Sequence, residues 1–365
     1  MTWNVGFLGA GPGAGALHLP TVGRLPSTFR VAHIADAGSG RAQALAEPLG
    51  ATWSKGHADL LADSEVEVVA ICSPPAEHAR QLLAAVKAGK KAIFCEKPLA
   101  TSVEAAKEVV AACQDAGTIL LVGTNHLHDA GWLRARQLLE QQGPGQQGPG
   151  QQGLEQQGLE QQGRLGSIAV TLALPPNDRY HRLVSEGGSF QAPARGGPEA
   201  PGPAVAAQIV KQLLTGLAVH DLPAVRHFAP DIERIEYARF VPPIGYAVGY
   251  KASGVSVQLA LTMLPAGPDA LWRMTFSSAE GRLDLDFPPP FVHAGSGWVS
   301  VVDADGSRRE YPSVDQDGYE AEWLHFAQLL EGHIPVDYHQ VLADALYPLE
   351  LADAVFATMT EGARR

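Results

Sequence analysis

The sequence predicts an α/β N-terminal domain with a doubly wound parallel sheet, followed by an α+β domain with a large, mostly antiparallel sheet. Over residues 3–122, short apolar runs alternate with helical stretches, as in successive strand–helix–strand units. From residue 232 onward, β-rich runs instead follow one another across short turns. We therefore expect a first domain over residues 1–125 and a second over residues 126–365.

Composition limits the class of protein. The 365 residues are 45% hydrophobic and 18% charged, which is typical of a chain that buries a large core. A formal net charge of -12 argues against nucleic-acid or anionic-membrane partners. Cys72, Cys95 and Cys113 lie in or beside apolar stretches without metal-ligand spacing, so we interpret them as buried thiols. We expect a cytoplasmic protein without a signal peptide or membrane span.

The first apolar run, residues 3–8, leads directly into a glycine-rich turn. The order is Gly9, Ala10, Gly11, Pro12, Gly13 and Ala14, with a short helix expected from Ala16. This is the G-x-G-x-x-A form of the dinucleotide fingerprint: a tight turn, a close approach of the pyrophosphate, and a small residue where the helix meets the strand. The free N–H groups of the helix N-terminus favour the phosphates. These features predict a Rossmann-type nucleotide site.

An acidic residue follows at the expected distance. The second apolar run, residues 30–35, ends at Asp36, roughly 20 residues after the glycines, where the ribose-binding carboxylate belongs. A carboxylate repels a 2′-phosphate, so we expect NAD rather than NADP. Arg41 is the residue that would accommodate NADP instead. The structural alternative for Asp36 is a helix cap at the end of the strand.

The alternation continues over the next hundred residues. A run over 66–72 ends at Ser73, Pro74 and Pro75, which we expect to line the cofactor crevice or to form an ordinary turn. Helices are predicted over 76–88 and 102–116. A strand over 119–122 closes the sheet, and Asn125 follows it as a hydrogen-bonding group near the nicotinamide or substrate.

The strand over 92–95 stops at Glu96, Lys97 and Pro98. Parallel strands deliver their last residues to the crevice where such sheets bind ligands. A lysine at this edge is a candidate proton carrier, because partial desolvation lowers its pKa toward the working range. Pro98 restricts Lys97 and allows a cis bond between them. The alternative is a surface Lys-Pro turn.

The second half begins after a low-complexity tract. Residues 141–163 are tandem five-residue units rich in Gln and Gly, predicted to be a flexible loop. A connecting helix over 129–140 precedes it. The strand-like and helical segments beyond the tract are expected over residues 168–174, 205–228, 232–240, 246–250, 255–264, 271–277, 282–287, 298–302, 320–330 and 341–360. The polar stretch 175–202 is a candidate cover for the active site, and the last helices are expected to pack back on the body.

These motifs, in this order, resemble the Gfo/Idh/MocA family, the group of glucose–fructose oxidoreductase and inositol dehydrogenase. The resemblance covers nearly the whole chain and is most specific at Glu96, Lys97 and Pro98; Val219, His220 and Asp221 carry its looser second-domain part. It implies an NAD(P)-dependent oxidoreductase that acts on sugars, cyclitols or related compounds. It also implies that Lys97 and His220 form the catalytic acid/base pair. The alternative for His220 is a core histidine on a helix.

The fingerprint and the resemblance together define the expected nucleotide site. The residues expected to bind the cofactor are Gly9, Gly11, Pro12, Gly13, Ala14, Asp36, Ser73, Pro74, His78, Glu96, Lys97 and Asn125. His126, His128, His181 and His227 are further candidates to supplement the pair of Lys97 and His220, and no spacing among them favours a metal site. A homodimer or homotetramer through the open face of the second sheet is also implied by the resemblance.

The chain departs from the family at one catalytic position. Many relatives carry an aspartate four residues before the histidine, whereas this chain has Gly216 there, after Thr215. The sequence therefore does not show which group takes the place of that aspartate in the proton path. Two other functions are weighed against a dehydrogenase: an NAD-binding sensor of the same fold, and an NAD-dependent glycoside hydrolase. An intact Lys97 argues against the sensor, and the absence of a Gly-Gly-His-His signature argues against the hydrolase.

Overall fold

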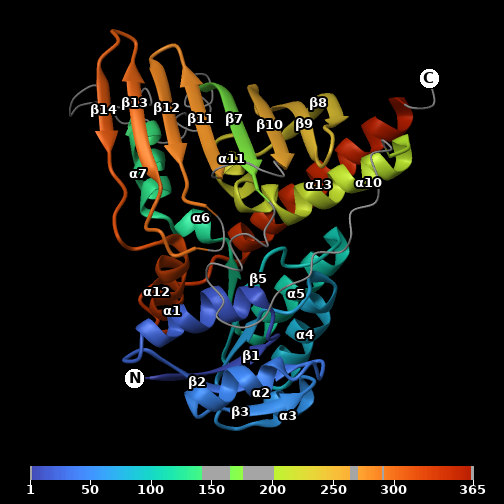
Figure 1. Cartoon of the computed structure of the whole chain (residues 1–365), viewed down its shortest axis with the longest axis vertical. Helices are drawn as coiled ribbons and strands as arrows, with labels where there is room; N and C mark the ends of the chain where they lie inside the picture. Colours follow the sequence, from blue (N-terminus) through green and yellow to red (C-terminus); the bar gives the residue numbers. More distant parts are fainter. Residues whose placement is uncertain (1, 142–164, 176–200, 264–269, 290–291, 363–365) are drawn as a thin grey trace.

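A six-stranded parallel sheet forms the lower half of the molecule (Figure 1). The computed structural model describes residues 2–141, 165–175, 201–263, 270–289 and 292–362; the predicted 141–163 tract and most of the 175–202 stretch lie outside these ranges. The strand order β3-β2-β1-β4-β5-β6 confirms the predicted doubly wound sheet. The strands are β1 (Trp3–Leu8), β2 (Phe29–Asp36), β3 (Thr52–Lys55), β4 (Val68–Ile71), β5 (Ala92–Glu96) and β6 (Ile119–Gly123).

Helices cover both faces of this sheet, because its strands are apolar on both sides. One apolar cluster joins the sheet to α1 (Leu19–Arg24) and α2 (Arg41–Ala46). The opposite cluster joins it to α3 (Ala58–Ala62), α4 (Pro75–Lys87) and α5 (Val103–Ala116). The five-residue helical turn Ala14–His18 opens the first crossover, so helical backbone begins two residues before the predicted start.

Two strands and the two short helices α3 and α6 (Asn125–His128) were missed by the sequence interpretation. β3 and β14 (Arg308–Tyr311) lie at the edges of their sheets. β3 has one buried residue, and β14 has no buried residue. An edge strand that packs on neither face lacks the apolar run by which strands are recognised. Helix α3 has only five residues, too few for a helical period to stand out.

An eight-stranded sheet forms the upper half, in the order β14-β13-β12-β11-β7-β10-β9-β8. All its neighbouring pairs are antiparallel except β7 and β10, which confirms a mostly antiparallel sheet. The remaining strands are β7 (Leu165–Leu174), β8 (Ile232–Phe240), β9 (Gly245–Ala252), β10 (Val255–Met263), β11 (Leu271–Ser278), β12 (Gly281–Asp286) and β13 (Trp298–Asp303).

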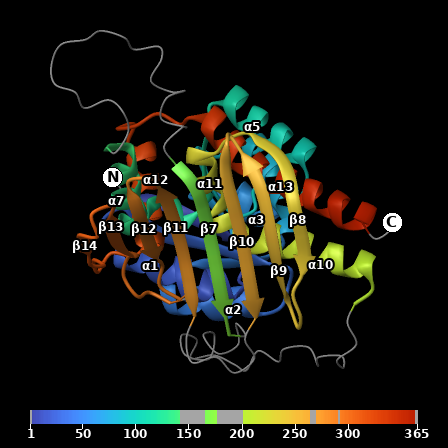
Figure 2. The ribbon, with the colours of Figure 1, turned by 90° about the horizontal axis from the view of Figure 1, so that it is seen from above.

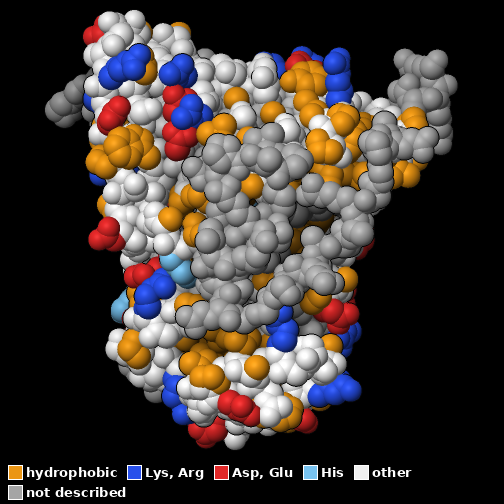
Figure 3. Space-filling model, in the orientation of Figure 1, with side chains coloured by type: hydrophobic (Ala, Val, Ile, Leu, Met, Phe, Trp, Pro, Cys, Tyr) orange, Lys and Arg blue, Asp and Glu red, His pale blue; other side chains and the backbone are white. Residues whose placement is uncertain are grey.

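One face of the upper sheet is packed and the other is open. The inner side chains of the strands form a single core with α7 (Ala130–Gln141), α10 (Pro203–Gly216), α11 (Leu222–Phe228) and α13 (Tyr338–Gly362). Figure 2 looks onto the other face, with the helices beneath the strands. Over β12–β14, acidic and basic side chains lie next to each other (upper left of Figure 3). Arg282 and Asp284, both on β12, form an ion pair at 2.9 Å.

Helix α12 (Gly318–Leu330) returns from the second half to complete the first core. Its Trp323 is fully buried, and its ring stacks on Phe94 of β5 with centroids 4.7 Å apart and planes at 7°. Phe29 of β2 packs edge-on against the same indole at 5.1 Å. The nucleotide-binding sheet is therefore covered on one face by residues from far along the chain. The division at residues 125 and 126 stays a prediction.

None of the helices in the described ranges has the length and apolar character to cross a membrane. Within those same ranges, no group of three or more histidine, cysteine or acidic side chains is placed to hold a metal ion.

Candidate active site

The glycine-rich turn connects β1 to the first helix at the carboxyl edge of the parallel sheet. Gly9 has φ +108°, and a Cβ there would lie 2.6 Å from the carbonyl of Cys72, so no other residue fits. Around Gly11 and Gly13, no described atom lies within 4 Å of the position of a Cβ. The turn thus leaves open backbone beside a helix N-terminus, which fits the pyrophosphate of a dinucleotide.

Gly9→Ala tests this turn directly. We expect a lower melting temperature and a large loss of dinucleotide affinity, because the added methyl group must displace the backbone of Cys72, just after β4. Gly23→Ala is the matched control, since its Cβ meets no described atom. Thermal unfolding and fluorescence titration with NADH measure both effects. Unchanged affinity in a folded Gly9→Ala protein would contradict the assignment of the turn.

Asp36 ends β2 and is held within its own turn. Its carboxylate accepts hydrogen bonds from the Gly38 N–H at 2.7 Å, the Ala42 N–H at 3.2 Å and the Ser39 hydroxyl. These bonds lower its pKa against the raising effect of partial burial, so it is an anion at neutral pH. The side chain thus makes the capping contacts of the structural alternative, and ribose binding by Asp36 stays a prediction.

Arg41 lies beside the glycine-rich turn. Its Nε donates to the Ala10 carbonyl at 2.8 Å, which fixes the guanidinium next to the proposed nucleotide site. An arginine fixed there is the feature that accommodates a 2′-phosphate. The turn therefore carries a carboxylate, which favours NAD, and a guanidinium, which favours NADP.

His78 corrects one predicted cofactor contact. It is fully buried, and its ring nitrogens lie 2.8 Å from the carbonyl oxygens of Ser73 and Pro98. Because both carbonyls accept, a neutral imidazole donates to one of them at a time. Its nitrogens are occupied by backbone, so His78 ties the loop after β4 to the loop after β5. Ser73 is likewise engaged through its side chain, which donates to Gln81 at 2.8 Å.

Glu96 at the end of β5 is part of a buried network that positions the loop carrying Lys97. One carboxylate oxygen lies 2.7 Å from Nε2 of His18, and the other accepts the backbone N–H of Lys97 at 3.0 Å. Trp323 of α12 donates to Nδ1 of His18 at 3.2 Å, so Nε2 of a neutral His18 carries the proton toward Glu96. The predicted cis bond is present between Lys97 and Pro98.

Lys97 reaches across to the second half of the molecule. Its Nζ donates to the carbonyl oxygen of Gly216 at 3.0 Å, at the C-terminal end of α10. Helix C-termini carry partial negative charge on their free carbonyls, which suits an ammonium group. Burial lowers the pKa of Lys97, and the charge of Glu96 opposes that shift. At the position where many relatives carry aspartate, this chain uses a backbone carbonyl.

His220 lies four residues beyond that carbonyl, in the 3₁₀ turn Ala218–His220. Its Nδ1 is 2.9 Å from Oδ1 of Asn125, an amide oxygen that only accepts, so Nδ1 carries the proton and Nε2 is left with a free lone pair. Burial lowers the pKa of His220 well below its ordinary value, with further lowering by the charges of Lys97 and His126. Asn125 thus orients the histidine.

The comparison with known protein families matches the N-terminal part of the chain. Residues 3–124 match the family model described as the oxidoreductase family with an NAD-binding Rossmann fold, GFO_IDH_MocA. Residues 3–124 belong to the Gfo/Idh/MocA oxidoreductase family. Among curated relatives, inositol 2-dehydrogenase 3 of Saccharopolyspora erythraea is 35% identical over 146 residues, which are 40% of this chain and 43% of that protein. The matched part is therefore less than half of the relative.

Likeness in fold extends beyond the matched segment. A 3-ketoreductase from Actinomadura kijaniata, solved with TDP-benzene and NADP, superposes with a TM-score of 0.69 at 22% identity, covering 97% of this chain and 96% of that one. UDP-N-acetylglucosamine 3-dehydrogenase from Acidithiobacillus ferrooxidans also gives 0.69, at 17% identity, covering 98% and 99%. At these identities the likeness establishes the two-sheet fold and not the activity.

A second histidine lies beside the predicted pair, and it is one of the four that the sequence offers as a supplement to that pair. The ring centroid of His126 is 5.3 Å from that of His220, and its Nδ1 is 2.9 Å from the fully buried carboxylate of Asp221. Trp272 of β11 donates to both oxygens of Asp221 at 2.9 Å. The ring of His126 also stacks on Phe287 at 3.7 Å. Only the proximity of Asn125 and His126 in sequence could have signalled this network.

Proposed function

We propose that this protein is an NAD(P)-dependent oxidoreductase that transfers a hydride between a nicotinamide and a secondary alcohol or carbonyl of a sugar, cyclitol or related polyhydroxylated molecule. The observation that carries the proposal is the bond from Lys97 to Gly216, four residues before His220. It brings an ammonium group and an imidazole from the two halves together at the edge where the glycine-rich turn lies. The matched family supports the same chemistry.

The residues divide the reaction between them. The turn from Gly9 to Ala14 would hold the dinucleotide, which supplies the hydride acceptor when bound. In the oxidation, Nε2 of His220 accepts the hydroxyl proton, because Nδ1 is occupied by Asn125. Lys97 donates a hydrogen bond to the same oxygen as negative charge develops on it. In the reduction, the two groups return a proton to the carbonyl oxygen.

A substrate panel tests the proposal. Sugars, inositols and aminosugars are incubated with NAD or NADP, and formation of the reduced cofactor is read by absorbance. We expect turnover with at least one member and a measurable preference between the two cofactors. Tight NAD binding with no turnover on any member would instead establish a nucleotide sensor, and release of free sugar without net NADH would establish a hydrolase.

The pH profile of alcohol oxidation follows from the two shifted groups. His220 must be neutral to accept a proton. Its pKa is lowered, so it stays neutral at pH values just below about 6.5, where an ordinary histidine becomes protonated. Lys97 must be charged to donate, and its lowered pKa brings its deprotonation below the usual value of about 10.4. We expect kcat/KM to hold through pH 6 and to fall early on the alkaline side. A steep loss of kcat/KM near pH 6.5 would contradict the assignment.

We also propose that the open face of the eight-stranded sheet is a contact between copies of this chain, giving a homodimer or homotetramer. Its central strands present small side chains to the outside, Ala169, Thr171 and Ala173 on β7 and Ala260 on β10. Such a flat surface allows two sheets to approach closely. Sedimentation equilibrium measures the mass, and a monomer at micromolar concentration would contradict the proposal.

A further inference from the structure

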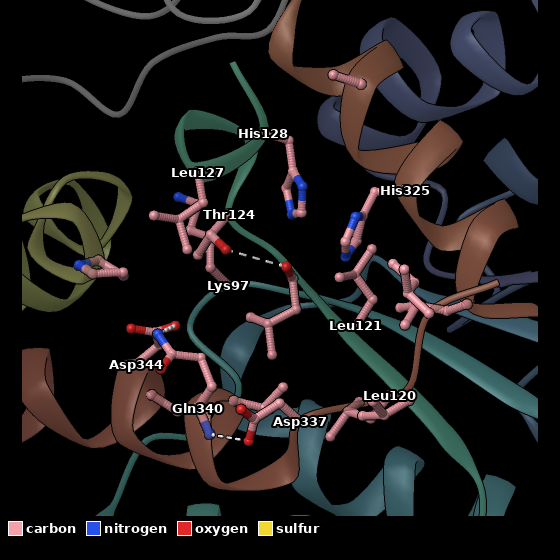
Figure 4. Close-up of a pocket in the computed structure, with 18 of the residues that line it drawn as sticks. Lys97, Leu120, Leu121, Thr124, Leu127, His128, His325, Asp337, Gln340 and Asp344 are labelled. Carbon is pink, nitrogen blue, oxygen red and sulfur yellow. Dashed lines mark hydrogen bonds between the residues drawn. The ribbon is translucent and has the colours of Figure 1, made fainter. Parts of the chain in front are cut away.

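A cavity of about 720 Å³ lies along the outer edge of β6, between α12 and the start of α13, with α6 (Asn125–His128) and α7 beside it (Figure 4). We call it the β6-edge cavity. Its volume is in the range that holds small-molecule ligands, and it is open to solvent. Most of its wall is apolar, for instance Leu120, Leu121, Leu127, Leu324, Ile334 and Val341.

The β6-edge cavity shares Lys97 with the candidate active site but lies to one side of the proposed pair of Lys97 and His220. Neither His220 nor Asn125 is among the described residues that line it, and both lie in a small neighbouring pocket instead. Lys97 and Pro98 contribute to its wall, so a molecule inside would contact the loop that carries the proposed catalytic lysine. The cavity is thus a second opening next to the reaction centre.

Two histidines face each other at one end of the cavity. His128 of α6 and His325 of α12 have ring centroids 4.7 Å apart, and Figure 4 shows both rings projecting toward the cavity. Neither ring has a hydrogen-bond partner within the described part of the chain. Burial lowers the pKa of His128 to about 3, with a further contribution from His325, and burial lowers the pKa of His325 as well. Both rings are therefore neutral, and each has one N–H to donate.

The other charged groups lie along the rest of the wall. Asp337 and Asp344 are drawn at the opposite end from the histidines (Figure 4). Asp344 is already paired with Arg226 at 2.7 Å, and Asp337 accepts the N–H of Gln340 at 2.9 Å. Arg136 and His227 complete the titratable groups of the lining besides Lys97. A negatively charged group of a ligand therefore fits better at the histidines than beside Asp337.

We propose that the β6-edge cavity binds an amphipathic monocarboxylate, with its carboxylate on His128 and His325 and its hydrocarbon portion along the leucines of β6 and α12. A carboxylate has two oxygens for the two unpartnered imidazoles, and charge-assisted hydrogen bonds of this kind are stronger than neutral ones. A hydrocarbon portion matches walls that offer a sugar few polar partners.

Binding should be coupled to protonation. An anion beside the two rings favours their charged form, so a proton is taken up when the carboxylate binds. One proton taken up changes the affinity by up to about tenfold per pH unit, and the affinity therefore rises as the pH falls. A simple carboxylic acid has a pKa near about 4, so the ligand stays ionised over the range tested.

Calorimetric titration of the full chain with octanoate at pH 6 and pH 8 tests the proposal. We expect saturable binding of one molecule per chain, at least about tenfold tighter at pH 6. Replacing both histidines (His128→Leu with His325→Leu) should weaken octanoate binding at least about tenfold and remove the pH dependence. Ala321→Trp, which fills the cavity from α12, should abolish binding. His339→Leu, on α13 outside the lining, is the matched control and should change nothing.

A titration with 1-octanol distinguishes the contribution of the carboxylate from that of the hydrocarbon chain. It should bind more weakly than octanoate at pH 6 and show no pH dependence, because it brings no charge to the histidines. Thermal unfolding confirms that each variant is folded. Three results would overturn the proposal. Octanoate binding does not saturate, octanoate binds the double variant as tightly as the wild type, or 1-octanol binds as tightly as octanoate at pH 6. None of these readouts depends on turnover, so they stand apart from the test of the proposed activity.

Discussion

Lys97→Ala is expected to reduce turnover by about 10²–10⁴-fold, the usual contribution of a positioned acid/base group, while NAD affinity stays unchanged. The ammonium group lies at the end of β5 and is bonded to the Gly216 carbonyl, so it approaches the reacting oxygen from the cleft between the halves. The backbone that would hold the dinucleotide belongs to the separate turn after β1. Loss of the side chain therefore removes proton chemistry and leaves the nucleotide contacts in place.

Steady-state rates and NADH fluorescence titration separate these two effects. The matched control is Lys87→Ala, an exposed lysine at the end of α4, which should leave both the rate and the affinity as they are. Retained turnover in Lys97→Ala would remove this lysine from the proton path. An equal loss of NAD affinity would instead assign it to cofactor binding.

His220→Gln is expected to cost a similar factor, about 10²–10⁴ in kcat. Glutamine is polar and of comparable size, and its side chain can keep a hydrogen bond to Asn125. It has no basic nitrogen, however, so the alcohol proton loses its acceptor. We also expect the acidic limb of the pH profile to disappear, because no titrating imidazole remains at that position.

A structural role for His220 would give a different result. If the histidine only filled space, His220→Gln would lower the melting temperature without removing the acidic limb. His339→Gln, on the exposed start of α13, is the matched control for both readouts. Partial rescue of the variant by added imidazole would support loss of the base as the cause.

Much of the nucleotide site could be predicted because its requirements are local. Gly9 must be glycine on account of its own φ and its contact with the next strand, and the run of glycines shows this in sequence. Lys97 and His220 were predicted from short motifs. In the structure, Lys97 donates a hydrogen bond to the carbonyl of Gly216, four residues before His220. That bond is made by a backbone carbonyl, which no side-chain pattern can indicate.

The remaining parts depend on contacts between distant segments. Trp272 binds Asp221 across 51 positions of the chain, and Asp221 in turn holds His126. The sequence around His78 does not show whether its ring faces a cofactor or the backbone. In the structure the ring is buried and contacts the two carbonyls of Ser73 and Pro98. The β6-edge cavity is lined by five helices and a sheet edge. Its facing histidines, His128 and His325, come from two of these helices and form no recognisable pattern in the sequence.

The indole of Trp323 has a consequence for biosynthesis. Phe29 and Phe94 are synthesised early, but the ring that packs against both is synthesised only after all the strands of the second sheet. Until then the nascent nucleotide-binding half exposes an aromatic slot to solvent or to chaperones. A fragment ending at residue 124 would keep that slot permanently, and it should aggregate or need a peptide covering 318–330 in trans to become soluble.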